Sequence, residues 1–419
     1  MSMKKSFLLL LTGNTAGQLI TLLISPILTR IYSPDDFGLF SVYTSLLVML
    51  LSFSTLCLEK AVPLEKDIAN VKQLIATSGF AVIIIALIVA VLGLTPWSLY
   101  TIYGVHTTYM NTLLLSLGLV FAGVYQVMSY QLLGVQHYKK LTNSKLIQAI
   151  SNGASQLAIS PMKVSSGFGL IIGDVIGRGV TTVYVTCDFF WKTKDIPVQL
   201  SKMTALLKKY RNFPLFSTWS TFLNVLSTQL IFLMLIRLYG VEITGYFSLT
   251  QKSIGMPITL IGGAISQIFY SEASRLFEKH AKKVLHLYLK IIKWCFLAGV
   301  IIFAGFAFIS PTVFSLVFGS QWEFSGELYR SLVFLYIIQF AILPISQILY
   351  ITGHQKGQLL IDALRLAGII GGVFLLKMLD VSFEGSLYFY SGICGVSYII
   401  LGISGYIILK RNVQKGSSK

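Results

Sequence analysis

The stretch that decides the fold reads LTRIYSPDDFGLFS at residues 28–41. A similar stretch, LIRLYGVEITGYFS, follows 207 residues later at residues 235–248. Arginine, tyrosine, an acid, glycine, phenylalanine and serine recur in register, and each stretch separates two long apolar runs. A weaker echo pairs Pro96 and Gly104 with Pro311 and Gly319. The sequence therefore indicates two copies of one membrane unit, an organisation with which many transporters build a cavity with two alternate openings.

Composition places this chain in a bilayer. Of its 419 residues 55% are apolar and only 12% are charged, which is too little polar surface for a soluble protein of this size. A hydrocarbon core about 30 Å thick requires about 20 apolar residues per helix. Such windows lie near residues 6–29, 38–58, 74–94, 110–131, 146–162, 167–189, 213–236, 244–269, 289–310, 329–351, 358–376 and 386–408. We expect an all-α integral membrane protein with about 12 transmembrane helices in two repeat-related six-helix bundles.

These windows give a domain organisation. We expect an N-terminal six-helix bundle at 1–191, a basic cytoplasmic linker at 192–212, a C-terminal six-helix bundle at 213–408 and a cytoplasmic tail at 409–419. The apolar run after Lys4 and Lys5 is too long for an ordinary signal peptide and lacks a cleavage signal, so it is expected to be an uncleaved first helix.

The distribution of charge gives the orientation. The net charge is +17, and 25 of the 33 basic residues fall on one side of the predicted spans, against five on the other side and three within helices. The positive-inside rule makes the basic side cytoplasmic and puts both termini there. Because the basic residues are spread over short loops rather than gathered on one face, a nucleic-acid partner is not expected.

No enzyme signature is present. The four cysteines lie in or at the ends of predicted spans, and the five histidines are scattered without metal-ligand spacing. No phosphate-binding glycine loop or nucleophile elbow occurs in a suitable context. We therefore expect no catalytic residue, no cofactor and no metal site.

Four segments carry a family resemblance. They are residues 26–40, the Glu-centred stretch 57–64, the run 245–274, and the sequence FGSQW at 318–322 followed by Gly326 and Arg330. Together they resemble bacterial polysaccharide-export flippases, members of the multidrug/oligosaccharidyl-lipid/polysaccharide exporter superfamily. The resemblance implies a bacterial inner-membrane protein that moves an undecaprenyl-diphosphate-linked oligosaccharide, an O-antigen or capsule repeat unit, from the cytoplasmic to the periplasmic leaflet. It further implies alternating access, proton or sodium antiport, and a polysaccharide polymerase and chain-length proteins as partners.

Polar stripes offer candidate cargo contacts. Asn14 and Gln18 share one face of the first predicted helix with Thr21, and Asn224 lies on the seventh helix with several hydroxyl side chains. Amides and hydroxyls suit sugar hydroxyls when they face a cavity. The same side chains also form hydrogen bonds between packed helices, so both interpretations stay open.

Ionisable residues inside the predicted spans distinguish cargo contact from helix packing better than these polar residues do, since intramembrane charge usually faces a cavity or a partner. Asp174 and Arg178 are spaced to pair on one helix, as are Asp362 and Arg365, while Lys252 has no acid within a turn of its own helix. The three cations are candidates to meet a diphosphate or acidic sugars. The alternative is that each arginine is neutralised by its aspartate and only holds helices together.

The repeat-related pair Arg30 and Arg237 is a candidate gate or release site, or each arginine ties its helix end to the acid five residues later. Glu59 is a candidate for ion coupling or for a loop ion pair. With no nucleotide-binding segment, energy must come from a gradient or from downstream consumption, so Asp174, Asp362 and Glu59 are the ion-coupling candidates.

Three other functions share some of these features. A multidrug exporter of the same superfamily shares the repeat but has no need of intramembrane cations. A membrane polysaccharide polymerase or glycosyltransferase needs sizeable loops outside the membrane, which this sequence lacks. A lipid II flippase is similar in chemistry but commonly has more spans.

Overall fold

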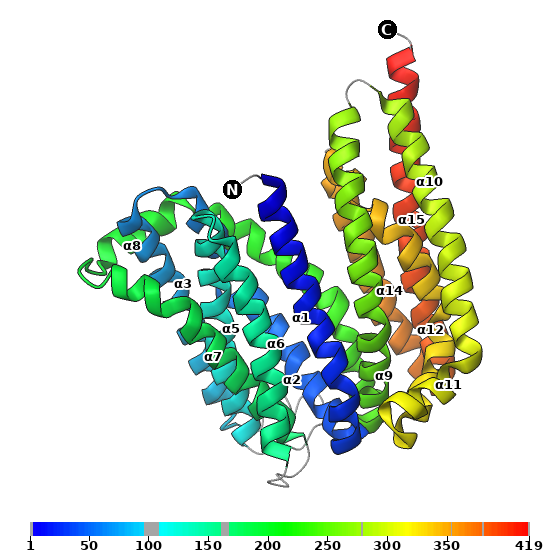
Figure 1. The fold of residues 1–419 in the computed structure, drawn as a ribbon, viewed down its shortest axis with the longest axis horizontal. Coiled ribbons are helices and arrows are strands. Elements are labelled where there is room, and N and C mark those ends of the chain that lie inside the picture. The colour runs from blue at the N-terminus through cyan, green and yellow to red at the C-terminus, as the bar shows by residue number, and fades with distance from the viewer. Residues whose placement is uncertain are drawn as a thin grey trace. The chain divides into compact units, whose positions relative to one another are not determined.

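The computed structural model describes residues 3–95, 109–160, 167–277, 280–352, 354–378 and 381–417. These residues form helices and connecting turns and contain no strand. The chain divides into two compact units, Met1–Gly245 (unit 1) and Tyr246–Lys419 (unit 2), and Figure 1 shows the ribbon of both. We describe each unit by itself.

The described part of unit 1 contains six long helices and one short helix before α9 begins. They are α1 (Met3–Ile31), α2 (Pro34–Ser54), α3 (Ile68–Leu92), α5 (Tyr109–Gly134), α6 (Tyr138–Ile159), α7 (Phe168–Lys192) and the short α8 (Leu200–Lys209). The 3-10 helix η1 (Leu58–Leu64) follows α2, and the π-helical turn η3 (Phe213–Ser217) leads into α9 (Thr218–Leu276), which continues into unit 2. Helix α6 lies alongside both α1 and α7 (Figure 1).

The core of unit 1 is built from tightly packed apolar side chains on α2, α5 and α7. Tyr43, Leu115 and Leu119 are fully buried there. Lipid is as apolar as these side chains, so their contribution comes from close van der Waals packing rather than from removal of water.

The turn between α1 and α2 is fixed by local hydrogen bonds. The Asp36 amide donates to Ser33 Oγ at 3.3 Å, and Ser33 N donates to Asp36 Oδ2 at 2.8 Å, which completes a capping box. Pro34 occupies the first helical position, where its missing N–H costs nothing. Helix α2 therefore begins at Pro34 and ends at Ser54, so the predicted window 38–58 starts and ends about one turn too late.

The second copy of this turn interrupts α9. Gly240, the repeat equivalent of Ser33, has φ +88° and ψ −179°, a conformation that breaks the helix and favours glycine. Two helices therefore meet at Gly240 within the continuous segment α9.

The two repeat-related turns touch each other within unit 1. A Cβ on Gly38 would lie 2.0 Å from the carbonyl oxygen of Val241, and a Cβ on Gly245 would lie 1.8 Å from the carbonyl oxygen of Pro34. Gly38 and Gly245 are repeat equivalents, and so are Pro34 and Val241. The contact is therefore reciprocal, and each glycine leaves room for the backbone of the other copy.

Unit 2 comprises the rest of α9 and the helices α10 (Ala281–Gly299), α11 (Gly305–Phe318), α12 (Glu323–Ile342), α13 (Ile348–Ile351), α14 (Gln355–Met378) and α15 (Phe383–Ser417). The π-helical η4 (Val300–Ala304) joins α10 to α11, and the 3-10 helices η5 (Ser320–Trp322) and η6 (Leu343–Ile345) flank α12. Helices α12 and α15 lie side by side (Figure 1). The core of unit 2 is aromatic, with Tyr329 and Tyr336 stacked 5.7 Å apart.

The predicted fold class is confirmed. Each of the twelve apolar windows overlaps a helix of the described chain, with α9 counted as two helices. Eight helical segments in the described residues are long and apolar enough to cross a membrane, one of which, Phe213–Leu276, is 64 residues long. The weaker sequence repeat pairs Pro96 and Gly104 with Pro311 and Gly319. Gly319 has φ +110° at the end of α11, whereas Pro96 and Gly104 lie outside the described residues.

Candidate functional site

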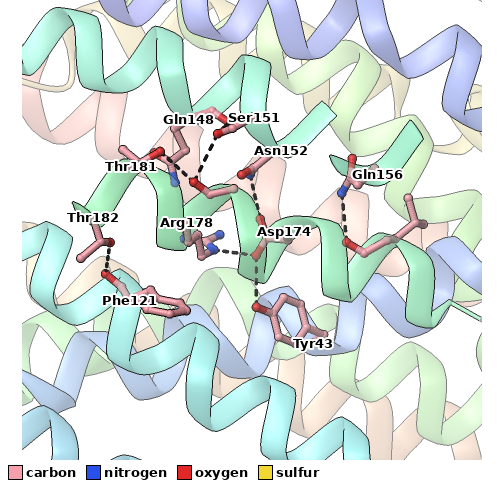
Figure 2. A network of polar contacts seen from close by, with 12 residues as sticks. Tyr43, Phe121, Gln148, Ser151, Asn152, Gln156, Asp174, Arg178, Thr181 and Thr182 are labelled. Atoms are coloured by element: carbon pink, nitrogen blue, oxygen red, sulfur yellow. Dashed lines mark hydrogen bonds and ion pairs between the residues drawn. The ribbon is translucent and has the colours of Figure 1, made fainter. Parts of the chain in front are cut away.

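A buried polar cluster of unit 1 centres on Asp174 in α7. Tyr43 Oη donates to Asp174 Oδ2 at 3.1 Å, Asn152 Nδ2 donates to Oδ1 at 2.9 Å, and Arg178 Nε donates to Oδ2 at 2.5 Å. Figure 2 shows these three side chains converging on the carboxylate from α2, α6 and α7. Hydrogen bonds to a charged group contribute about 1.5–3 kcal/mol each, so the cluster ties three helices together.

Close packing of α6 on α7 makes this cluster possible. A Cβ on Gly173 would lie 2.5 Å from Gln156 Cγ, and a Cβ on Gly177 would lie 1.8 Å from Asn152 Oδ1. Small residues four apart let two membrane helices approach at backbone distance. The two glycines thus bring the α6 amides within reach of α7.

Polar groups on α6 and α7 also form hydrogen bonds to neighbouring helices. Gln156 Nε2 donates to the carbonyl oxygen of Leu170 at 3.1 Å, and the carbonyl oxygen of Gln156 accepts a hydrogen bond from Tyr32 Oη at 2.8 Å. On the other side of α7, Thr182 Oγ1 donates to the carbonyl oxygen of Phe121 at 2.9 Å. These contacts, visible in Figure 2 for Gln156 and Thr182, hold α7 between α6 and α5.

The ion pair at the centre is unequally exposed. The Asp174 side chain is 4% exposed, whereas the Arg178 side chain is 19% exposed. The carboxylate is enclosed by three donors, while the arginine side chain keeps a small exposed surface. An arginine within an apolar helix usually faces a partner or a cavity, and here its partner is Asp174.

A second buried carboxylate lies at a strained turn after α2. Leu56 has φ +54° and Cys57 has φ +53°, so two consecutive residues with side chains adopt the left-handed conformation. The following 3-10 helix, η1, is seven residues long, longer than such helices usually are. Backbone strain of this kind concentrates at functional positions.

Glu59 is buried in this turn with a side chain that is only partly satisfied. It is 1% exposed, and its Oε1 accepts a hydrogen bond from Gln126 Nε2 at 2.9 Å. Its Oε2 is also buried and has no hydrogen-bond partner among the described residues. Next to it, Lys60 Nζ donates to Thr221 Oγ1 at 3.2 Å.

Unit 2 contains the second predicted ion pair. Arg365 Nη2 lies 3.1 Å from Asp362 Oδ1, and the guanidinium lies 6.0 Å from the centre of the Tyr398 ring. A cavity of about 440 Å³ opens beside it between α14 and α15, with Arg365 and Ser397 on otherwise apolar walls. Both ion pairs expected from sequence spacing are thus present, one in each unit.

The other candidate residues are dispersed. Lys252 is half-buried in the unit 2 part of α9. In unit 1, Arg30, Asn224 and Arg237 are exposed, whereas Gln18 is half-buried with its Oε1 enclosed and without a hydrogen bond in the described chain. The side chain of Asn14 lies outside the described residues.

The sequence alone did not single out Tyr43 or Gln126 as neighbours of the buried acids. Each is one of several polar side chains in a mostly apolar helix, so the sequence does not distinguish it from the others. Their partners are 131 and 67 residues away along the chain, a pairing that only the packed fold defines.

Comparison with known proteins gives the family. A family model described as "Polysaccharide biosynthesis protein" matches residues 27–326, and no curated protein matches the sequence. Among solved structures, the inward-facing conformation of a multidrug resistance MATE family transporter of the MOP superfamily shares 13% identity over 95% of this chain and 96% of that chain, with a TM-score of 0.68. A second solved structure, described as a MOP superfamily transporter from Pyrococcus furiosus with reverse polarity of its binding pocket, shares 15% identity with this chain. The match covers 98% of this chain and 96% of that chain, with a TM-score of 0.63.

At these identities the structural likeness shows the fold, while the family model covers most of the chain. The resemblance to polysaccharide-export proteins is thereby confirmed. The chain belongs to the polysaccharide biosynthesis protein family, and its fold is the fold of the MOP superfamily transporters.

Proposed function

We propose that this protein is a flippase that moves an undecaprenyl-diphosphate-linked oligosaccharide from the cytoplasmic to the periplasmic leaflet by alternating access. The observation that carries the proposal is the Asp174–Arg178 pair inside an apolar helix, in which the carboxylate side chain is 4% exposed and the arginine side chain 19% exposed. A diphosphate is best met by such a cation, because arginine can bind phosphate oxygens in bidentate fashion.

Two cations of unit 2 extend this proposal. Arg365 lies beside a cavity with apolar walls, which suits the junction between a charged headgroup and a prenyl chain. Lys252 supplies a point charge on α9. We further propose that Asn14, Gln18 and Asn224 contact sugar hydroxyls and that Arg30 and Arg237 act where cargo is released.

The test is complementation of a flippase-null bacterium. The intact protein is expected to restore surface polysaccharide, and Lys252→Ala is expected to lose at least tenfold of that display at equal membrane expression. Lys282→Ala, on the exposed surface of α10, is the matched control and should behave as the intact protein. Failure of the intact protein across several sugar backgrounds would overturn the cargo class. Full display with Lys252→Ala would overturn the role of that cation.

Among the three acids considered for ion coupling, Glu59 is the strongest candidate, with a proton as the ion. Asp174 already has three donors and Asp362 has an arginine, so taking up a proton would break existing contacts. Glu59 Oε2 has no donor in the described chain, so this oxygen is open to a ligand without the loss of an existing contact.

The proposed binding of a proton by Glu59 can be tested without cargo. Infrared difference spectra of the purified protein, recorded as the pH is changed, should contain a carboxyl C=O band that Glu59→Gln removes and Asp174→Asn leaves in place. A spectrum unchanged by Glu59→Gln would remove Glu59 from the coupling path, whatever the cargo is.

The second candidate function is export of drugs, because several solved relatives by fold are multidrug transporters. The intramembrane cations argue against cationic drugs. Efflux of a cationic dye from cells expressing the protein, with no effect on polysaccharide display, would favour this second function.

We also propose that the protein is not an enzyme and that it lies in the bacterial inner membrane with both termini cytoplasmic. The segments 1–191 and 213–408 would then be the two alternating bundles, 192–212 the linker and 409–419 the tail, with a polymerase and chain-length proteins as downstream partners. Reporter fusions after Lys415 and within 192–212 should both report the cytoplasm.

A further inference from the structure

The segment after α7 is held to unit 1 by an unusual set of contacts. Lys72 Nζ donates to the carbonyl oxygens of Thr193 and Ile196 at 2.6 and 2.7 Å. Gln73 Nε2 donates to the carbonyl oxygen of Pro197 at 2.8 Å, and its Oε1 accepts from the amide of Gln199 at 3.0 Å. Two neighbouring side chains of α3 thus fix the backbone that leads into α8.

Helix α8 itself packs against unit 1 through its apolar side chains. Met203 and Leu206 are buried, and Leu206 joins an apolar cluster that includes Leu74 and Ile75 of α3. At its end, Lys209 and Tyr210 both donate hydrogen bonds to Glu65. The helix is therefore a fixed part of unit 1, and its orientation is set by these contacts.

Its outer face combines cations with large apolar side chains. We call this surface the α8 platform. Its exposed basic residues are Lys192, Lys194, Lys202, Lys208 and Arg211, and its exposed apolar residues are Trp191, Val198 and Leu200. Trp191 is 76% exposed and Leu200 75% exposed, and Lys194 Nζ lies 5.6 Å from the centre of the Trp191 ring. The acid within this stretch is Asp195.

The α8 platform lies where two spanning helices end. Helix α3 begins at Ile68 with Asp67 as its cap, and α7 ends at Lys192, so the platform lies at one end of these helices of unit 1 (Figure 1). We expect this end to be level with the headgroups. At that depth tryptophan and leucine reach the acyl boundary while lysine side chains extend to the headgroups.

We propose that the α8 platform is a binding site for anionic phospholipid headgroups. The site is selective because five exposed cations accompany the exposed apolar side chains, and each is attracted to an anionic surface. The platform would concentrate anionic lipid around the end of α7, independently of the cargo carried by the protein.

Trp191 provides a built-in reporter. The full-length protein is placed in nanodiscs of equal parts phosphatidylglycerol and phosphatidylcholine, with bromine on the acyl chains of only one of the two lipids. The two nanodiscs then have the same lipid composition. The difference in quenching of tryptophan fluorescence reports which lipid lies next to the Trp191 ring. Subtraction of the same signals from Trp191→Phe isolates this tryptophan from the others.

Brominated phosphatidylglycerol is expected to quench Trp191 at least twofold more than brominated phosphatidylcholine. That preference should fall at high salt because exposed charges are screened. The triple variant Lys202→Gln/Lys208→Gln/Arg211→Gln should abolish it, whereas Lys282→Gln/Lys283→Gln/Lys290→Gln on α10 should preserve it.

Equal quenching by the two lipids would overturn the proposal, as would a preference that survives the triple variant. Absence of quenching by either lipid would show that something other than lipid covers Trp191, and it would overturn the proposal as well. None of these outcomes depends on transport, so failure here is separable from failure of the proposed function.

Discussion

At the scale of single residues, the buried acids differ in the number of hydrogen bonds that their carboxylates accept. Asp174 has three donors from three helices, whereas Glu59 has one. A buried ion pair contributes little net stability, but removing one partner leaves an uncompensated charge. The two acids therefore differ: Asp174 holds a cation in place, whereas Glu59 keeps one oxygen without a donor in the described chain.

The Asp174–Arg178 pair allows structure and function to be separated. Arg178→Ala is expected to destabilise the protein by about 3–5 kcal/mol, because Asp174 would be left buried without its cation. The double variant Asp174→Leu/Arg178→Met should recover most of that loss in thermal unfolding followed in detergent.

Polysaccharide display by that double variant then decides the role of the pair. A well-folded double variant without display agrees with a cation that contacts cargo. Full display would mean that the pair serves packing alone.

A glycine gives a second prediction at this scale. Gly177→Ala would place a Cβ 1.8 Å from Asn152 Oδ1, and overpacking of this kind costs about 1–3 kcal/mol. Gly79→Ala on α3 meets nothing within 4 Å and is the control. Thermal unfolding should show a lower midpoint for the first variant only, and equal midpoints would contradict the close α6–α7 contact.

At the scale of elements, α8 depends on the charge of Glu65. The hydrogen bond from Lys209 lowers the pKa of Glu65, and the same contact raises the pKa of Lys209. The Glu65 contribution is present above the unfolded glutamate pKa of about 4.3 and is lost as pH falls through its lower folded value. The Lys209 contribution is present below about 10.4 and is lost as pH rises through its higher folded value.

Helix α8 should therefore stay docked at neutral pH and loosen in acid. Hydrogen exchange of residues 200–209, corrected for the intrinsic effect of pH, should rise as pH is lowered to about 3, below the glutamate range. Lys209→Met should raise exchange at neutral pH, whereas Lys208→Met, one residue earlier and exposed, should not. Equal protection in both variants would assign the docking to Met203 and Leu206 instead.

Most elements were predictable from the sequence, and their long-range partners were not. Apolar length identified the spans, and local spacing identified the Asp174–Arg178 and Asp362–Arg365 pairs, because both signals are short in range. The start of α2 was also encoded, in the capping pattern from Ser33 to Asp36, but apolar length alone placed it too late. The strained turn before Glu59 has no local signal, since leucine and cysteine do not favour positive φ.

At the scale of the whole molecule, the repeat seen in sequence has a physical counterpart in the reciprocal contact of Gly38 and Gly245. A Cβ added at either position would lie 2.0 Å or less from a backbone carbonyl oxygen, so neither tolerates a side chain without movement. Because the two environments are equivalent, the two substitutions should have matching effects.

Gly38→Ala and Gly245→Ala are each expected to reduce the yield of folded protein severalfold, as measured by fluorescence-detected gel filtration. Gly255→Ala, with nothing within 4 Å of its added Cβ, should leave the yield unchanged. A loss with one of the two variants and normal yield with the other would show that the contacts are not energetically equivalent.

The reciprocal glycine contact has the form of an interface between identical subunits, in which residue i of one copy meets residue j of the other and j meets i. A chain of half this length, carrying one turn of this kind, would already hold both sides of the contact and could pair with a second copy of itself. Duplication and fusion of such a half-length ancestor would have required no new surface at this junction. The two halves could then diverge elsewhere, as the buried Asp174 cluster of one and the aromatic core of the other have done.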